Sequence, residues 1–228
     1  MLGVAGAVYI LGVRRRLLRS GASDEEVSRP YPGAELIPDG RRTATMAATI
    51  DAPPSKVWPW LVQMGCDRAG WYSWDRLDNG GVRSAERIHA EWQTLSVGDH
   101  LASTPSGRTW FEVAALEPER FLGLRASIDL QRGRSFDPTG RRPRFYVDSL
   151  WAFQLEELCD GRTRLVVSGY ASARPQVLQT IADRLFWEPA HWIMQTRQFR
   201  NLKRRAERRA LATQESNGCP KTRSVRRL

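Results

Sequence analysis

The side chains best suited to move a proton lie in two short stretches. Asp75 and Asp78 stand three residues apart, a spacing at which two carboxylates could bracket a proton transfer. Asn79 begins a turn-rich segment, however, and turns use aspartate side chains for hydrogen bonds to the backbone. His191 follows Glu188 by three residues, so a carboxylate could orient or charge its imidazole, although a solvent-facing helix surface explains the same spacing. All three residues are candidates, and the sequence assigns no catalytic residue.

The common enzyme signatures are missing from the sequence. It has no GxSxG, HExxH, GxxxxGKS/T or GxGxxG motif, which removes the usual hydrolase, metalloprotease and nucleotide-binding sites. The three histidines, His89, His100 and His191, are too scattered for a local metal motif. The three cysteines are odd in number and lack CxxC spacing. We therefore expect no metal site, no cofactor and a reducing compartment.

Aromatic residues give the strongest candidate site, which is a ligand cavity. Such cavities have apolar walls with few polar groups, and Trp and Tyr supply an apolar body with one hydrogen-bonding tip. Ordinary core packing explains the same rings, and for Phe111 and Phe153 the two interpretations stay open. The candidate ligand-binding residues are Trp71, Tyr72, Trp74, Phe111, Trp151 and Phe153.

A strand and a short helix precede three of these rings. Residues 42–50 (RTATMAATI) carry apolar side chains at alternate positions, which predicts a half-buried strand. The proline pair at 53–54 suits a first helical turn, and Val57, Trp58, Leu61 and Met64 continue at helical spacing until a glycine at 65. The GWYSW stretch follows this stop, so we expect its rings at the wall or mouth of the cavity.

An antiparallel meander and a long helix complete the pattern. Residues 109–116, 120–127, 145–155 and 164–173 have the character of strands joined by turns, and 129–144 has the composition of an exposed loop. From Pro175 to Leu202 the apolar period becomes helical, which predicts one long amphipathic helix. Pro189 lies on its apolar stripe, so we expect a kink near the middle of this helix.

Several ordered stretches resemble a known superfamily. They are APPSKVWPWLVQMG, GWYSWD, the pattern QxLxVGD from Gln93 to Asp99, and EPAHWIM before LKRRAE. Over about residues 22–209 they resemble bacterial SRPBCC-superfamily proteins of the polyketide cyclase/dehydrase and lipid-transport type. The resemblance implies an α+β helix-grip fold, a curved antiparallel sheet of about seven strands wrapped around a long C-terminal helix. It transfers no catalytic residue, because members bind lipids, sterols or polyketides and only some catalyse reactions.

The chain divides into four expected parts: 1–20, an apolar and basic segment; 21–40, a capped turn and linker; 41–212, the helix-grip domain; and 213–228, a basic disordered tail. The linker portion, 29–40, should lack regular structure, and Ser23 with Glu26 has the spacing of a capping box. The apolar run at the start spans about 20 Å as a helix, too short for a bilayer. It is interpreted as the end of a longer membrane helix, an interfacial anchor, or a short helix packed on the domain.

The formal net charge of +10 is concentrated at the two ends of the chain. Arg14, Arg15 and Arg16 follow the apolar run, and Arg204 and Arg205 belong to a basic helix ending. These arginines could face an anionic membrane surface on the cytoplasmic side, although solvation explains them equally. Nucleic acid is not an expected partner, because the aromatic residues are not interleaved with the basic ones.

Three functions remain open at the level of the sequence. The leading hypothesis is a cytoplasmic, membrane-proximal protein that binds an apolar small molecule or lipid as a carrier or sensor, without chemistry. The alternatives are a cofactor-independent polyketide-type cyclase or dehydratase, and a regulatory module that presents its basic helix to a membrane or partner.

Overall fold

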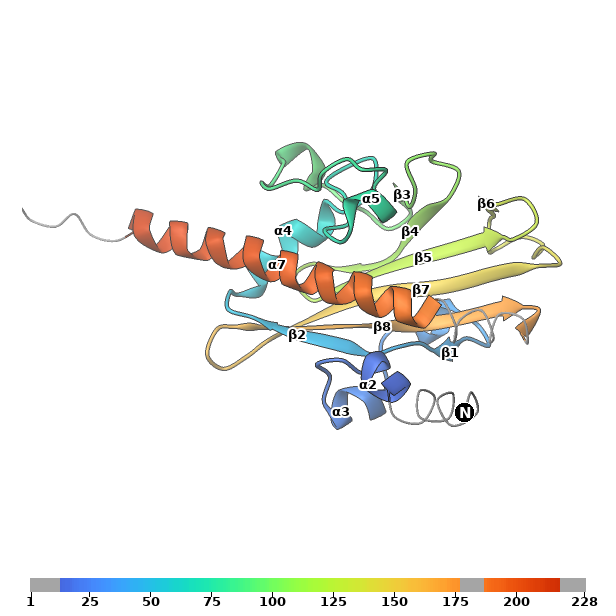
Figure 1. Cartoon of the computed structure of the whole chain (residues 1–228), viewed down its shortest axis with the longest axis horizontal. Coiled ribbons are helices and arrows are strands. Elements are labelled where there is room, and N and C mark those ends of the chain that lie inside the picture. Colours follow the sequence, from blue (N-terminus) through green and yellow to red (C-terminus); the bar gives the residue numbers. More distant parts are fainter. Residues whose placement is uncertain (1–12, 177–186, 218–228) are drawn as a thin grey trace, which may run out of the picture.

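One antiparallel sheet runs through the molecule, and a long helix crosses one of its faces (Figure 1). The computed structural model describes residues 13–176 and 187–217, with side chains as far as residue 208. The strands are β1 (Arg41–Arg42), β2 (Met46–Ile50), β3 (His100–Ala102), β4 (Trp110–Glu117), β5 (Phe121–Asp129), β6 (Arg134–Ser135), β7 (Tyr146–Glu157) and β8 (Thr163–Arg174). The helices are α2 (Arg14–Leu18), α3 (Asp24–Ser28), α4 (Pro54–Val62), α5 (Asp75–Asp78) and α7 (Glu188–Asn217), with short 3-10 helices η2 (Ala34–Leu36) and η3 (Ala90–Trp92).

The two longest strands form the centre of the sheet. β7 and β8 pair along all 12 residues of each, and the strand order is β1-β8-β7-β5-β4-β3, with β2 beside β8 and β6 beside β5. Alternating apolar residues predicted this hairpin because a strand with one buried face repeats every two residues. The antiparallel meander is confirmed. Its eight strands include β1 and β6, which have two residues each.

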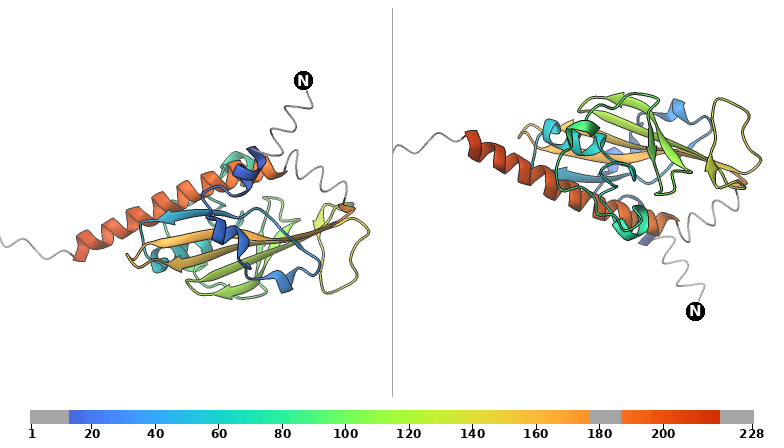
Figure 2. Two further views of the ribbon diagram at one scale, coloured as in Figure 1. Left: turned by 90° about the horizontal axis from the view of Figure 1, so that it is seen from below. Right: turned by 90° about the horizontal axis from the view of Figure 1, so that it is seen from above.

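Helix α7 packs on what we call the inner face of the sheet (Figure 2). Its buried side chains Phe199, Leu202 and Ala206 join a core that includes Met46 of β2 and Phe153 of β7. Helix α4 adds its apolar side to the same core, and its early prolines leave the first turn intact because the N–H groups there have no helical partner. The helix-grip α+β fold expected from the sequence is therefore confirmed.

The kink predicted at Pro189 in the long helix stays a prediction. Helix α7 is described from Glu188, directly after the π-helical residue Trp187, so Pro189 lies next to a change in helix type. The upstream half of the predicted helix falls on residues 177–186, outside the described part of the chain. The last turns of α7 run past the edge of the sheet (Figure 1).

The outer face of the sheet is covered by a segment that was expected to lack regular structure. Residues 29–40 contain η2, and they bury Tyr31 and Ile37 against Phe121, Leu150 and Val166. The Tyr31 hydroxyl lies 2.9 Å from the carbonyl oxygen of Ala152 in β7 and 3.0 Å from that of Val166 in β8. Burial raises the pKa of this hydroxyl, so it stays a donor. Apart from the three residues of η2, this segment has no helix or strand, and its few apolar residues cover this face of the sheet.

The predicted capping box is present and is tied to the sheet. Ser23 Oγ accepts from the Glu26 backbone N–H, and the Glu26 carboxylate accepts from the Ser23 N–H. The same carboxylate accepts from Arg164 of β8 at 2.7 and 2.8 Å. Hydrogen bonds from the Arg164 guanidinium hold the pKa of Glu26 at about 2, although burial opposes this shift. The ion pair therefore fastens α3 to the sheet.

Glu26→Gln is expected to lower the free energy of unfolding by about 1–2 kcal/mol at pH 7, less than the full pKa shift implies because the pair is partly hydrated. A lowered folded-state pKa adds stability above the unfolded pKa and loses it as pH falls. The difference between the two proteins should thus shrink between pH 4.5 and 2, measured by urea unfolding. Glu25→Gln, at an exposed neighbour, is the control, and an equal loss there would contradict the assignment.

Candidate ligand-binding site

Four of the six predicted rings meet on the inner face of the sheet. We call Trp71, Phe111, Trp151 and Phe153 the ring cluster. The Trp71 ring centroid lies 5.3 Å from that of Phe111 and 5.6 Å from that of Trp151. Trp151 lies 5.6 Å from Phe111 and 4.7 Å from Phe153. Trp71 and Phe153 are buried whereas Phe111 and Trp151 stay partly exposed, so the cluster is core on one side and surface on the other.

The other two rings do not join this cluster. Tyr72 is 0% exposed, its hydroxyl accepts from Gln63 Nε2 at 2.7 Å, and its ring meets Trp60 edge to face. It is a core residue, and burial raises the pKa of its hydroxyl. Trp74 is 42% exposed and lies outside, with the Arg197 guanidinium 4.2 Å above its ring.

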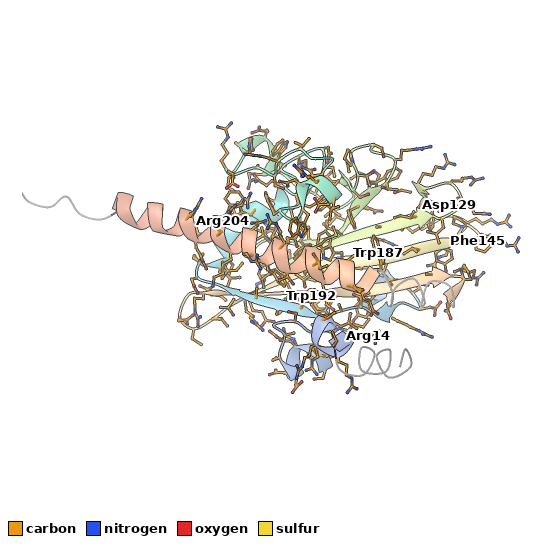
Figure 3. All side chains as sticks on the ribbon, viewed as in Figure 1. Arg14, Asp129, Phe145, Trp187, Trp192 and Arg204 are labelled. Atoms are coloured by element: carbon orange, nitrogen blue, oxygen red, sulfur yellow. The ribbon has the colours of Figure 1, made fainter. Side chains whose placement is uncertain are left out.

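Inner-face side chains of the sheet are larger at one end than at the other. The strand register gives four successive rows: Met46, Val167, Phe153 and Leu122; Gly169, Trp151 and Leu124; Ala171, Ser149 and Ala126; Ala173, Val147 and Ile128. We call the last two rows the small-residue end, where every residue but Ala126 is partly exposed. Figure 3 shows Asp129 and Phe145, which flank these rows in the sequence, beyond the first turn of α7.

Gly169 marks the boundary between the two halves of the inner face. A Cβ atom at this position would lie 1.8 Å from the carbonyl oxygen of Leu150 in β7, well inside van der Waals contact. No side chain therefore stands beside Trp151 on β8. The glycine is required by the close approach of the two strands.

The side of α7 that faces the sheet becomes polar toward the start of the helix. Residues three and four apart share one side of a helix, which aligns Leu202 and three residues that we call the polar stripe, namely Gln198, Gln195 and His191. Leu202, Gln198 and Gln195 are buried, and His191 is partly exposed. The sequence prediction missed both glutamines, although two amides on an apolar stripe at helical spacing were a visible signal.

A chain of hydrogen bonds joins the polar stripe to the ring cluster. Trp151 Nε1 donates to Gln195 Oε1 at 3.2 Å, Gln195 Nε2 donates to Gln198 Oε1 at 2.8 Å, and Gln198 Nε2 donates to the Trp71 carbonyl at 2.9 Å. These three bonds connect β7, α7 and the loop after α4. They form a polar floor between the apolar core and the small-residue end.

The spacing of His191 and Glu188 suggested a contact that the structure does not form. Glu188 accepts two hydrogen bonds from Arg14, at 2.6 and 2.7 Å, because α2 packs beside the start of α7. Burial lowers the pKa of His191, so its imidazole is neutral at pH 7. A charged imidazolium oriented by Glu188 is therefore excluded.

The two candidate aspartates have different surroundings. Asp75 Oδ1 accepts from the Ser84 hydroxyl at 2.6 Å and the Ser84 backbone N–H at 3.1 Å, as expected of a turn. Both carboxylate oxygens of Asp78 are buried without a hydrogen bond from any described residue. Burial raises the pKa of Asp78 to about 6, with a smaller contribution from the Asp75 charge.

The basic residues proposed to face a membrane are not equivalent. Arg14 is paired with Glu188, and Arg204 reaches Glu86 at 3.2 Å. Arg205 is buried because it donates to the Ala85 carbonyl and to Glu86, and its guanidinium lies over the Tyr72 ring. The prediction that Arg205 lies on an exposed, membrane-facing surface was therefore wrong, and this residue makes structural contacts instead. Arg15 and Arg16 are exposed.

Within residues 13–176 and 187–217, no group of three or more His, Cys, Asp or Glu side chains is placed to hold a metal ion. His89 lies against Trp92, and His100 stacks on Trp110. No helix in the same ranges has the length and apolar character needed to cross a membrane.

An open pocket of about 680 Å³ lies at the turn between β4 and β5, away from the ring cluster. Its walls include Glu117, Glu119, Glu156, Glu157 and Arg120. Four carboxylates around one guanidinium do not suit an apolar ligand, so this pocket is not the predicted cavity.

Known structures with a similar backbone include bacterial proteins and Ara h 8.0201. MLL2253 from Mesorhizobium loti is 20% identical with a TM-score of 0.41, over 72% of this chain and 97% of that one. The Polyketide_cyc-like protein Cgl2372 from Corynebacterium glutamicum is 16% identical with a TM-score of 0.33, over 80% and 99%. Ara h 8.0201 is 15% identical with a TM-score of 0.40, over 74% and 99%.

The sheet and long helix of the chain itself have the helix-grip arrangement that the resemblance implied. No protein-family model matches the sequence, and no curated protein matches it either. At these identities and TM-scores the solved structures give no information on the ligand or activity of this chain.

Asp78→Asn is expected to raise the free energy of unfolding by about 1 kcal/mol at pH 7.5, after allowance for the partial exposure of the residue. A carboxyl whose folded pKa is raised favours folding below its unfolded pKa and opposes it once pH rises through the folded value. The gain should therefore fade between pH 6 and 4, measured by urea unfolding. A loss of stability at pH 7.5 would instead mean that the ionised carboxylate has a stabilising partner.

Proposed function

We propose that this chain binds an apolar small molecule or lipid between the start of α7 and the small-residue end of the sheet, as a carrier or sensor. The observation that carries the proposal is the change in size along the inner face. Two rows of Ala, Ser, Val and Ile side chains lie where a packed core would need larger ones, and all of them but Ala126 are partly exposed. A well-packed interior does not leave such rows bare, so a ligand is the natural occupant.

The ring cluster and the polar stripe would form the other walls of this site. Phe111 and Trp151 each present a partly exposed ring, which supplies apolar area at small entropic cost. The polar stripe gives a few hydrogen-bonding groups opposite the sheet. Apolar walls with few polar groups are typical of small-molecule sites.

A cofactor-independent cyclase or dehydratase is the second candidate function. Its support is His191, which is neutral at pH 7 because burial lowers its pKa, as a general base requires. Asp75 is held by Ser84, which leaves Asp78 as the other ionisable group of the original three with a buried and unpaired carboxylate. Catalysis would need a second proton-transfer group beside the ligand, whereas binding needs none.

Ala171→Leu is expected to weaken binding of N-phenyl-1-naphthylamine, an uncharged apolar dye, at least about tenfold, because the added side chain fills the small-residue end. Fluorescence titration measures the affinity. Ser172→Leu is the matched control, since it adds the same bulk to the other face of β8 and should leave affinity unchanged.

Equal affinity for the dye in the wild type and Ala171→Leu, with both proteins folded, would reject the site. Native mass spectrometry of the purified wild type should also show a bound apolar molecule. Turnover of a co-purified molecule would favour the cyclase alternative.

The proposed location near an anionic membrane is supported by an exposed surface beside α7. The Ser73 hydroxyl donates to the Met194 carbonyl, and Trp74 lies under Arg197, so the segment leading into α5 borders α7. Leu77 on α5 is 75% exposed and Ile193 on α7 is 46% exposed. Arg76 and Arg200 are also exposed, which adds positive charge to an apolar surface, as interfacial binding requires.

A double variant, Leu77→Asp with Ile193→Asp, should reduce flotation with phosphatidylcholine vesicles that contain phosphatidylserine by at least about fivefold. Vesicles of phosphatidylcholine alone should bind weakly in every case. Val97→Asp is the control, because Val97 is 62% exposed on another loop. No flotation of the wild type would reject the membrane location and leave the regulatory-module alternative, in which the basic helix meets a protein partner.

A further inference from the structure

We propose that the ligand of this site is uncharged and carries one polar group, a hydroxyl or a carbonyl, which binds Gln195 and His191. The inference rests on the proposed function and adds the chemical class of the ligand.

Gln195 is buried with part of its hydrogen-bonding capacity unused. A glutamine amide has two N–H donors and two acceptor lone pairs. Gln195 accepts once, from Trp151, and donates once, to Gln198. One donor and one lone pair are left without a partner among the described residues, on a side chain that is 2% exposed. Bulk solvent hardly reaches this amide, and an unsatisfied buried group costs about 1–3 kcal/mol.

The orientation of that amide is fixed from both ends of the hydrogen-bond chain. An indole N–H can only donate, so Gln195 must turn its oxygen toward Trp151. The Trp71 carbonyl can only accept, so Gln198 must turn its nitrogen toward it and its oxygen toward Gln195. A flip of the Gln195 amide would place its NH2 group against the indole N–H, and a flip of the Gln198 amide would place its oxygen against the Trp71 carbonyl oxygen. The unused donor of Gln195 therefore has one orientation in space.

His191 provides a second group of the same kind one helical turn away. It lies four residues before Gln195, on the same side of α7. A neutral imidazole carries one N–H donor and one acceptor nitrogen. Gln195 and His191 together offer donors and acceptors without charge, which suits a hydroxyl or a carbonyl.

Among the described residues at the start of α7, Arg14 and Glu188 neutralise each other. Arg14 and Glu188 form a two-bond ion pair at 2.6 and 2.7 Å, so neither charge is left to balance a ligand. A carboxylate or phosphate in this site would lose its hydration without an opposite charge, which is costly. The site therefore favours a neutral ligand over an anionic one.

Three rigid probes of one shape test this inference: naphthalene, 2-naphthol and 2-naphthoate, titrated at pH 7 by calorimetry. The wild type should bind 2-naphthol about tenfold more tightly than naphthalene, the value of one hydrogen bond, and more tightly than 2-naphthoate. Equal affinity for naphthol and naphthalene, or strongest binding of naphthoate, would overturn the inference. Failure of all three to bind would overturn the proposed function itself.

Two variants assign the preference to the named residues. Gln195→Leu and His191→Phe should each bring the naphthol-to-naphthalene ratio toward one while naphthalene binding persists, which shows that the site stays folded. Arg200→Gln, on the exposed side of α7, should keep the wild-type ratio. An unchanged ratio in both Gln195→Leu and His191→Phe would contradict the assignment even if the wild type prefers naphthol.

Discussion

The contact between α7 and one end of the sheet is the constraint on which the rest of the structure depends. Phe199, Leu202 and Ala206 pack with the large residues of β2, β7 and β8, and burial of this apolar surface holds the helix against the sheet. Because α7 is one continuous helix, this packing also fixes the position of its N-terminal turns. The polar stripe therefore stands opposite the small-residue end because of packing several turns away.

The small-residue end has little apolar packing of its own, and polar contacts on the outer face support it. Asp148 in β7 is fully buried and accepts from Arg125 of β5 at 2.8 and 2.9 Å and from Ser127 at 2.9 Å. Hydrogen bonds to Asp148 raise the pKa of Arg125. Such a bidentate pair cross-links β5 and β7 directly behind Val147 and Ser149. The inner face can thus stay open while its strands stay aligned.

The sequence predicted elements and faces better than it predicted individual contacts. Alternation along 145–155 and 164–173 was sufficient for the central hairpin, and the same parity brought Trp151 and Phe153 to one face. The fate of Tyr72 and Trp74 was not predictable from type or spacing. Tyr72 has a φ of 57°, a left-handed conformation that residue type and spacing do not predict for a tyrosine.

The contacts that sequence missed depend on partners far along the chain. Arg205 belongs to a run of basic residues that appears exposed, and its burial depends on the carbonyl of Ala85 and on Glu86. Arg14 meets Glu188 across 174 positions, so the apparent pairing of Glu188 with His191 was replaced by a stronger ionic one. Local spacing carries no information on either contact.

Gly169 gives the site a property that side-chain choice alone would not. Because a Cβ there would collide with the backbone of Leu150, substitution at this position disturbs the strand pairing before it could fill the space beside Trp151. Neighbouring Ala and Ser positions can exchange small residues for larger ones and so alter the room for a ligand over evolutionary time. Substitution by larger residues cannot fill the space at Gly169 in the same way. Descendants of this chain would therefore keep the space beside Trp151 even as the rest of the site changed shape.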